Sequence, residues 1–431
     1  MKVLSFKDPG FAAVAAKMKR RAVPTMELRD TVAAIISDVA EKGDAALIAY
    51  TKRFDGVDLP LKHLFVSEKE FAAADALVED STRVAVAASL LNIHEFAKRS
   101  MRTDWSRRNA QGAVVGERFT PFDRVGVYVP GGKAPLVSTA LMTAGFAQAA
   151  GVPQIIAATP VGADGTVNAA LLYALRAAGV TEVLKIGGAQ AIAALALGTK
   201  SVSPVDRIFG PGNRFVVEAK RQLVGAVSID LLPGPSEILI LSDKTGDAEC
   251  IAADILAQAE HGGDSVVGFL TDSKALLGKV VKAVQKQLAS LSRSKIIHEV
   301  LRTGTFLLHV KSMEQGMQLV NDFAPEHLSL ISEQEDQWLA KVRTAGAIYL
   351  GNHSPVAVGD FLAGPSHTLP TGGAGRSFSG LRADQFQRRT SIVKMNLAAV
   401  KKSLPIVEEF ARVEGLDAHG RSVSIRLDSA K

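Results

Sequence analysis

Residues 321–330 read NDFAPEHLSL and set a carboxylic acid, Glu326, directly beside an imidazole, His327. Pro325 precedes the pair and stiffens the backbone there. Two neighbouring groups of different intrinsic pKa can serve two successive proton transfers, one toward an alcohol and one toward water. An isolated Glu-His dipeptide is also common on solvated surfaces, so the pair gains weight only from other polar groups in the chain.

Three further strings supply such groups: QAEHGGD at 258–264, GDFLAGPSHTLPTGG at 359–373 and EGLDAHG at 414–420. Gln258 and His261 are three residues apart, which on a helix places both side chains on one face. Amide, imidazole and carboxylate donors suit Zn²⁺ or a similar divalent cation. For the histidine the alternative is helix capping, and for the aspartate it is a turn position. The polar groups offered to one site are Gln258, His261, Asp360, His367 and His419.

Glycine-containing loops recur in the middle of the chain, at 130–132, 187–191, 210–213 and 234–237. Glycine lets backbone amides approach a ligand closely, and a helix that begins after such a loop presents unpaired N–H groups to phosphate. No GxGxxG follows a predicted strand, so the usual fingerprint of dinucleotide binding is missing. Each loop alone is typical of a turn, whereas four at successive strand ends indicate a ligand crevice.

Composition indicates a globular protein of about two or three domains, because 47% of its 431 residues are hydrophobic and 22% are charged. The net charge of +6 is dispersed, and the basic cluster KMKRR at 17–21 predicts a solvated helix face rather than a nucleic-acid site. The single Cys250 excludes an internal disulfide and indicates a reducing compartment, and its helical context predicts a buried residue. No signal peptide or membrane-spanning run is visible, so we expect a cytoplasmic protein without a membrane partner.

The order of predicted elements favours an α/β fold. From residue 125 to 235 short β-rich runs alternate with alanine-rich helical stretches, which is typical of βαβ units with a parallel sheet covered on both faces. A second such alternation extends from 237 to 351. Helices are expected from Thr25 to about residue 108, and the polar tail from 380 onward is expected to be helix followed by a short strand.

With these strings in place, the chain resembles the histidinol dehydrogenase family over essentially its whole length. The resemblance is carried by YVPGGKAPLVSTALM, GGAQAIAALALGT, FGPGN, AKR, IDLLPGPSE, ILAQAEHGGDS, NDFAPEHLSL, GDFLAGPSHTLPTGGAGRSFSGL and EGLDAHG. So many distinctive strings in one order are highly specific. LVSTALM, TAGFAQAAGV and GNHSPVAVGD depart from the family's usual pattern beside cofactor or metal residues, and these departures bear on fine specificity.

The resemblance implies a homodimer of two incomplete Rossmann-like parallel-sheet domains, with an N-terminal extension and a helical C-terminal tail that reaches the partner subunit. The implied parts are an extension at 1–25, a discontinuous metal and substrate domain at 26–127 and 236–379, an NAD-binding domain at 128–235, and a tail at 380–431.

Roles for individual residues also follow from the resemblance. The implied zinc ligands are Gln258, His261, Asp360 and His419. The implied catalytic acid/base pair is Glu326 and His327, and the implied NAD-binding residues are Tyr128, Gln190 and Asn213. The implied substrate-binding residues are Ser236, Gln258, His261, His327, Asp360, His367, Glu414 and His419. In the family the last two would complete the site of the neighbouring subunit.

The implied reaction is oxidation of L-histidinol to L-histidine through L-histidinal, with two NAD molecules reduced in turn and one zinc ion per subunit acting as a template. His327 would take the alcohol proton, Glu326 would activate water, and Glu414 would offer charge to the substrate amine. The alternatives are a related dehydrogenase for another small polar alcohol such as a sulfonated propanediol, a zinc hydrolase, and a non-catalytic nucleotide-binding module. Glu414 favours an amino-bearing substrate, and the glycine loops speak against a hydrolase.

Overall fold

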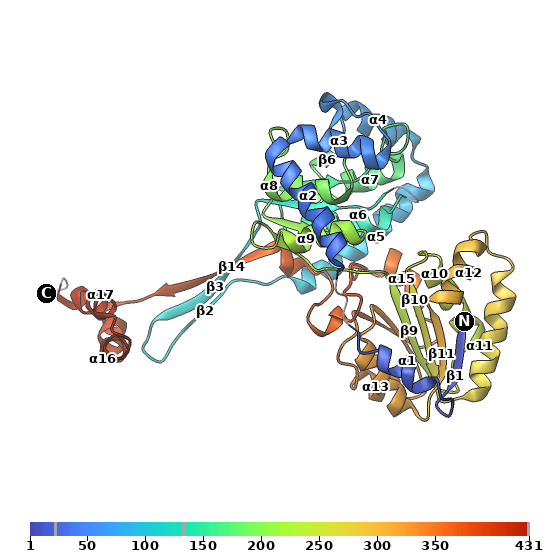
Figure 1. Ribbon diagram of the computed structural model, residues 1–431. Coiled ribbons are helices and arrows are strands. Elements are labelled where there is room, and N and C mark those ends of the chain that lie inside the picture. The colour runs from blue at the N-terminus through green and yellow to red at the C-terminus, as the bar shows by residue number, and fades with distance from the viewer. Residues whose placement is uncertain (21–23, 132–134, 429–431) are drawn as a thin grey trace.

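The computed structural model describes residues 1–20, 24–131 and 135–428. Two α/β bodies lie next to each other, and a long ribbon of strands carries the C-terminal helices away from both (Figure 1). The expected fold class, two parallel-sheet domains with a helical C-terminal tail, is therefore confirmed.

The smaller sheet lies in the upper body of Figure 1. Its strands are β4 (Arg124–Tyr128), β5 (Gln154–Ala158), β6 (Glu182–Leu184), β7 (Arg207–Phe209) and β8 (Ser228–Ile229). They pair in parallel in the order β6-β5-β4-β7-β8. Counted from its first strand the order is 3-2-1-4-5, which is the Rossmann order without a sixth strand.

Helices cover both faces of this sheet. They are α2 (Met26–Lys42), α3 (Asp44–Asp55), the 3-10 turn η1 (Leu61–His63), α4 (Glu68–Leu77), α5 (Asp80–Ser100), α6 (Val137–Ala149), α7 (Ala169–Ala177), α8 (Gly188–Leu197) and α9 (Arg214–Gln222). Successive side chains of β4 point to opposite faces, so Val125 and Val127 pack with α4 to α7 whereas Tyr128 packs with α2, α3, α8 and α9. A strand that is apolar on both sides needs this double cover.

The larger sheet forms the second body. Its strands are β1 (Lys2–Ser5), β9 (Glu237–Ser242), β10 (Val266–Thr271), β11 (Thr305–His309), β12 (His327–Ile331) and β13 (Ala347–Leu350). All pair in parallel, in the order β1-β11-β10-β9-β12-β13, which repeats 3-2-1-4-5 with β1 added at one edge. Its helices are α1 (Phe11–Lys17), α10 (Ala248–Ala259), α11 (Lys274–Leu288), α12 (Ser294–Thr303), α13 (Met313–Phe323), α14 (Glu335–Leu339) and α15 (Val356–Phe361).

Part of the expected domain division needs correction. Residues 26–127 were assigned from the sequence to the metal and substrate domain, but α2 and α5 bury Ile35 and Ile93 in the cores of the smaller sheet. Their apolar faces are covered there, so these helices belong to the smaller-sheet body. The N-terminal extension supplies β1 to the larger sheet. The expected start of the helical region at Thr25 is confirmed, because Thr25 caps α2.

A three-stranded antiparallel ribbon projects from the bodies and carries two helices at its tip (Figure 1). The ribbon consists of β2 (Trp105–Arg108), β3 (Val114–Pro121) and β14 (Gln387–Lys394), and the tip consists of α16 (Leu397–Glu414) and α17 (Asp417–Asp428). We call these five elements the arm. Before it, the 3-10 turns η2 (Ala374–Arg376) and η3 (Ala383–Phe386) remain in the body. Phe386 stacks on Phe209 at 3.8 Å between ring centroids, so the expected tail begins with an anchored segment.

Several local predictions were wrong. Residues 105–108 and 387–394 were expected to be helical, but they are the strands β2 and β14. Each of them forms its backbone hydrogen bonds with β3, which lies between them. The final segment, expected to be a strand, is the helix α17, which packs on α16. Cys250 lies in α10 as expected but is exposed, not buried. In the ranges that the structure describes, no helix combines the length and the hydrophobicity needed to cross a membrane.

Candidate active site

The Glu326–His327 pair lies at the amino end of β12, next to the amino end of β9. Ser236 immediately precedes β9, and its hydroxyl donates to Glu326 Oε2 at 2.8 Å. Gln258, in the last turn of α10, donates through Nε2 to Ser236 Oγ at 2.8 Å. Four expected site residues therefore form one connected network where the strand order reverses. Ligands of open α/β sheets usually bind beyond the carboxyl ends of the strands, whereas this network lies at the opposite end.

The ring of His327 is held in one tautomer. Nδ1 lies 2.9 Å from the main-chain oxygen of Glu237, which can only accept, so Nδ1 carries the proton. Nε2 is buried without a hydrogen-bond partner and lies 3.5 Å from Asp360 Oδ1. Burial alone would lower the pKa of His327, but the carboxylates of Glu326 and Asp360 raise it to about 9. Nε2 is thus the nitrogen that remains to exchange a proton with a ligand.

The carboxyl group of Glu326 is buried at the same place. Its Oε2 accepts from the main-chain N–H of Glu237 at 2.7 Å in addition to the Ser236 hydroxyl. Burial raises the pKa of Glu326 to about 7, although the charge of His327 and these hydrogen bonds lower it. A carboxyl group that titrates near neutral pH can act as a general base under physiological conditions.

Asp360 is the negative group that faces these imidazoles. Burial would raise the pKa of the Asp360 carboxyl, but the nearby ring of His327 and the charges of His367 and His261 lower it overall. His367 Nδ1 donates to the main-chain oxygen of Asp360 at 2.9 Å, and its Nε2 lies 3.1 Å from Thr139 Oγ1. Burial also lowers the pKa of His367. Both ring nitrogens are therefore occupied, and His367 ties α6 of the smaller-sheet body to Asp360.

His261 lies just beyond the end of α10, and its side chain is exposed. Its charge acts on Asp360, so the two side chains lie close enough to interact. Gln258 uses its amide N–H for Ser236, and its amide oxygen, the atom that can bind a metal, is not part of that bond. One amide oxygen, one imidazole and one carboxylate are donors of the kind that Zn²⁺ accepts, so these residues fit such an ion.

Across the three described ranges, no group of three or more His, Cys, Asp and Glu side chains is arranged to hold a metal ion. The expected ligand set accounts for this result. Within one body it contains only two residues of these four types, His261 and Asp360, because Gln258 is an amide and His419 lies on the arm. The fourth expected ligand, His419, is exposed in α17, and Glu414 is exposed at the end of α16. Both lie at the tip of the arm, away from the network (Figure 1). A single chain does not bring them to the other site residues.

The expected NAD-binding residues gather at the carboxyl edge of the smaller sheet. Tyr128 ends β4, and its hydroxyl accepts from the N–H of Gly188, the first residue of α8, at 3.0 Å. Asn213 follows β7 and caps α9, with Oδ1 accepting from the first amides of that helix at 3.0 and 3.2 Å. Gln190 Oε1, in α8, is buried without a hydrogen-bond partner. A buried acceptor without a partner fits a ligand that carries an N–H group, such as a carboxamide.

Glycine is required at one point of this edge. Gly210 has a φ of +107°, and a Cβ there would collide with the carbonyl of Tyr128. The loop 210–213 is therefore pressed against the end of β4, at the reversal point where such sheets bind ligands. Residues 187–191 follow β6 as expected and form the start of α8, whereas residues 234–236 precede β9, which begins at Glu237. Gly132 of the loop 130–132 lies outside the described residues.

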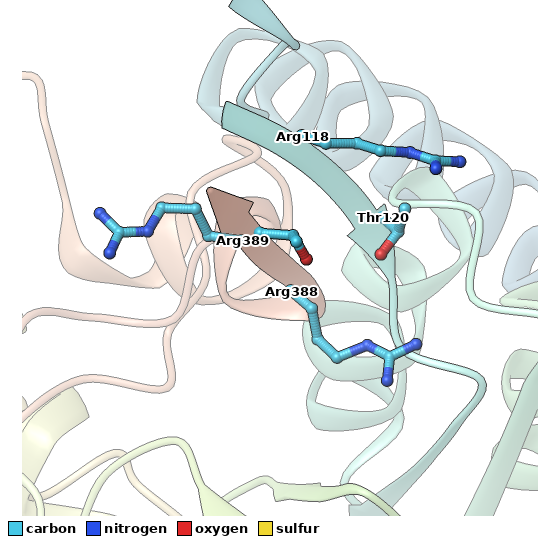
Figure 2. A pocket seen from close by; sticks show the side chains of 5 residues that line it. Arg118, Thr120, Arg388 and Arg389 are labelled. Carbon is cyan, nitrogen blue, oxygen red and sulfur yellow. The ribbon is translucent and has the colours of Figure 1, made fainter. Parts of the chain in front are cut away.

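A hollow of about 530 Å³ lies on the arm (Figure 2). Its lining consists of Arg118, Thr120, Arg388, Arg389 and Thr390. Alternation along the two strands sends Arg118 and Arg388 to one side and Arg389 to the other (Figure 2). Guanidinium groups stay protonated at all working pH values, so this lining offers no general base and is not the catalytic site.

Three residues at the network were not singled out from the sequence. Glu237 supplies main-chain contacts to both members of the pair, and Thr139 contacts His367. The ring of Tyr349 lies 6.0 Å from that of His327, and burial raises its pKa. Glu237 could have been found by its place beside Ser236 in the 234–237 loop. Thr139 lies within the quoted string LVSTALM and Tyr349 just before GNHSPVAVGD, but nothing in either string marked these side chains as neighbours of the pair.

Comparison with known proteins agrees with the geometry. A family model described as histidinol dehydrogenase matches residues 18–427. The histidinol dehydrogenase of Syntrophotalea carbinolica is 42% identical over 428 residues, covering 99% of this chain and 99% of the relative. That of Bacillus licheniformis is 42% identical over 402 residues, covering 93% and 94%.

The fold is matched as closely as the sequence. The crystal structure of histidinol dehydrogenase from Elizabethkingia anophelis superposes with a TM-score of 0.93 at 35% identity, covering 100% of this chain and 98% of that one. Sequence and fold agree over nearly the full length, and the chain belongs to the histidinol dehydrogenase family.

Proposed function

We propose that the chain catalyses the NAD-linked oxidation of L-histidinol to L-histidine through L-histidinal, with one zinc ion per subunit. The observation that carries the proposal is the buried network in which Ser236, Glu326 and His327 are joined. A base with a fixed tautomer and a carboxyl group titrating near neutral pH are what two successive oxidations with an intervening hydration require. NAD would accept the hydride in each oxidation, held by Tyr128 and Gln190 at the smaller sheet.

In the first oxidation the neutral ring of His327 takes the proton of the substrate alcohol at Nε2, because Nδ1 is already committed to the Glu237 carbonyl. The pKa of about 9 belongs to a ring that faces the charge of Asp360, and a cation held by Asp360 would offset that charge and favour the neutral ring. In the hydration Glu326 takes a proton from water, with Ser236 and the Glu237 N–H holding Oε2 in place. His327 then serves again when the hydrated aldehyde is oxidised. Positioning by these fixed hydrogen bonds lowers the entropic cost of each transfer.

The ion would be held by Gln258, His261 and Asp360 of one chain, with His419 as a fourth ligand. When bound, it would fix the substrate imidazole and amine and thereby orient the alcohol carbon. Asp360 is kept ionised by its histidine neighbours, which suits a ligand for a cation.

Chelation should abolish turnover, and replacing His261 by Asn should reduce bound zinc to well below one per subunit, because one of three donors in the body is lost. Elemental analysis of purified protein measures the second effect directly. His298→Asn is the matched control, since His298 is exposed in α12 and its ring contacts the main chain of Ser294 in the same helix. Full zinc retention in His261→Asn would contradict the ligand assignment.

The hydration step should depend on pH through Glu326. Burial raises its pKa to about 7, His327 opposes this shift and Glu237 adds to it. The carboxyl is thus increasingly protonated, and inactive as a base, as pH falls below about 7. With histidinal and NAD supplied, the rate should fall by about tenfold per pH unit on the acid side. The Glu326→Gln variant should be slow and should lack this limb; an unchanged acid limb in that variant would assign it to another group.

A homodimer is part of the proposal. Exposed apolar side chains crowd the arm: Ile392, Val393, Leu397, Ile406, Phe410 and Val413. A two-helix tip of this composition has no core of its own large enough to cover them, so a second copy packing on the arm would do so. Crossing of the arm to the partner would carry Glu414 and His419 to the network of the other subunit.

The function is tested with purified protein, histidinol and NAD by following NADH absorbance before and after chelator treatment. A sulfonated propanediol is the comparison substrate. We expect NADH to form with histidinol and not with the sulfonated diol. Formation only with the sulfonated diol would move the substrate to the other class within the family.

A further inference from the structure

We infer that Glu237 is a positioning residue for the catalytic pair and that Arg20 of the N-terminal segment holds it in place. The inference rests on the proposed function, because it explains how the catalytic pair of that reaction, Glu326 and His327, is held in a fixed relative position. Glu237 is itself neither a proposed metal ligand nor a proposed cofactor residue. It acts instead through its main chain.

The main chain of Glu237 binds both members of the pair. Its N–H donates to Glu326 Oε2 at 2.7 Å, and its carbonyl oxygen accepts from His327 Nδ1 at 2.9 Å. One peptide segment therefore sets the distance between the carboxylate and the ring and also selects the ring tautomer. A small rotation of this segment would displace both groups at once.

The side chain of Glu237 explains why this segment stays in place. The carboxylate is 1% exposed, with Oε1 accepting from the Gly372 N–H at 3.0 Å and Oε2 lying 2.6 Å from Arg20 Nη2. Three segments that are distant in the sequence, those of Arg20, Glu237 and Gly372, thus meet at this one carboxylate. Burial raises the pKa of Glu237, and the charge of Arg20 opposes that shift.

Arg20 is itself held in place by contacts with other parts of the fold. Its guanidinium stacks on the ring of Phe323 at 3.7 Å, and its main-chain oxygen accepts from Arg376 at 3.4 Å. Phe323 is the last residue of α13, the helix that leads into the catalytic pair. The expectation that KMKRR is a solvated face therefore fails at Arg20, whereas neighbouring Lys19 is solvent-exposed in a 3.7 Å ion pair with Asp322. Arg21 lies outside the described residues.

The test compares Arg20→Met, the double variant Arg20→Met with Glu237→Gln, and Lys19→Met as matched control. NAD-binding stoichiometry, measured by calorimetry, counts the folded molecules independently of turnover. Arg20→Met should lower kcat by about tenfold or more per folded molecule, because misplacement of reacting groups is costly. The KM for NAD should stay within about twofold, since the proposed cofactor edge lies on the other sheet.

The double variant should recover much of the lost kcat, because a neutral amide at 237 needs no counter-charge and keeps the Gly372 contact. Recovery in the double variant supports the inference even if Arg20→Met alone does not fold. A wild-type kcat in Arg20→Met, an equal loss in Lys19→Met, or a double variant no better than the single one would each overturn it. If the wild-type protein formed no NADH from histidinol, the proposed function would fail together with this inference.

Discussion

Replacing His327 by Asn is expected to lower turnover of histidinol by about 100-fold or more, the usual contribution of a positioned acid or base. The physical reason is specific to one atom. Nε2 is the ring nitrogen that is free to take the alcohol proton, and an asparagine side chain offers no basic nitrogen there. A loss of about 100-fold corresponds to roughly 2.7 kcal/mol of transition-state stabilisation.

The measurement is steady-state NADH formation at saturating histidinol and NAD, with zinc content and NAD binding determined on the same samples. Both of these should remain at wild-type levels, because His327 is not among the proposed metal or cofactor residues. His309→Asn is the matched control in the same sheet, where the ring contacts Ser5 and the main chain of Asp272. Normal turnover in His327→Asn would remove His327 from the proton-transfer role.

The sequence was most informative where pattern and local chemistry coincide. Alternation of apolar strands and alanine-rich helices predicted both parallel sheets, because strands covered on both faces need apolar side chains on both sides. It was least informative where tertiary contacts decide. The QRRTSIVK segment of β14 is polar and exposed, and only its pairing with β3 makes it a strand. The helices at 26–100 could not be assigned to a sheet from periodicity, since an apolar face does not specify its partner.

The same distinction applies to the site. Motif strings identified Ser236, Gln258, Glu326 and His327. The structure joins the first three by hydrogen bonds and places His327 Nδ1 3.6 Å from Glu326 Oε2. The strings could not show that the network would lie at the amino ends of β9 and β12, opposite the edge that such sheets normally use. The motif strings also could not show that one buried carboxylate, that of Glu237, would connect three segments of the chain beside the catalytic pair. Contacts of that kind join residues far apart in sequence, and no local pattern encodes them.

Two inactive variants should restore activity when they are mixed. His327→Asn inactivates the network in the body, and His419→Asn removes the imidazole that the arm is proposed to deliver to the partner. In a mixed dimer with crossed arms, one site combines a normal body with a normal arm. Random exchange makes about half of the dimers mixed, so activity should recover to about a quarter of the wild-type level.

Refolding the two variants together and separately, followed by NADH assay at equal protein, measures this recovery. Each variant alone should stay near the background rate. If each arm served its own body, every site in the mixture would carry one defect, and no recovery would appear. Because Glu414 and His419 lie at the exposed tip of the arm in a single chain, recovery by mixing is the outcome that follows from an arm completing a neighbouring site. Its absence would mean that each arm completes its own body, whereas normal activity of His419→Asn alone would place the fourth donor elsewhere, in the substrate or in water.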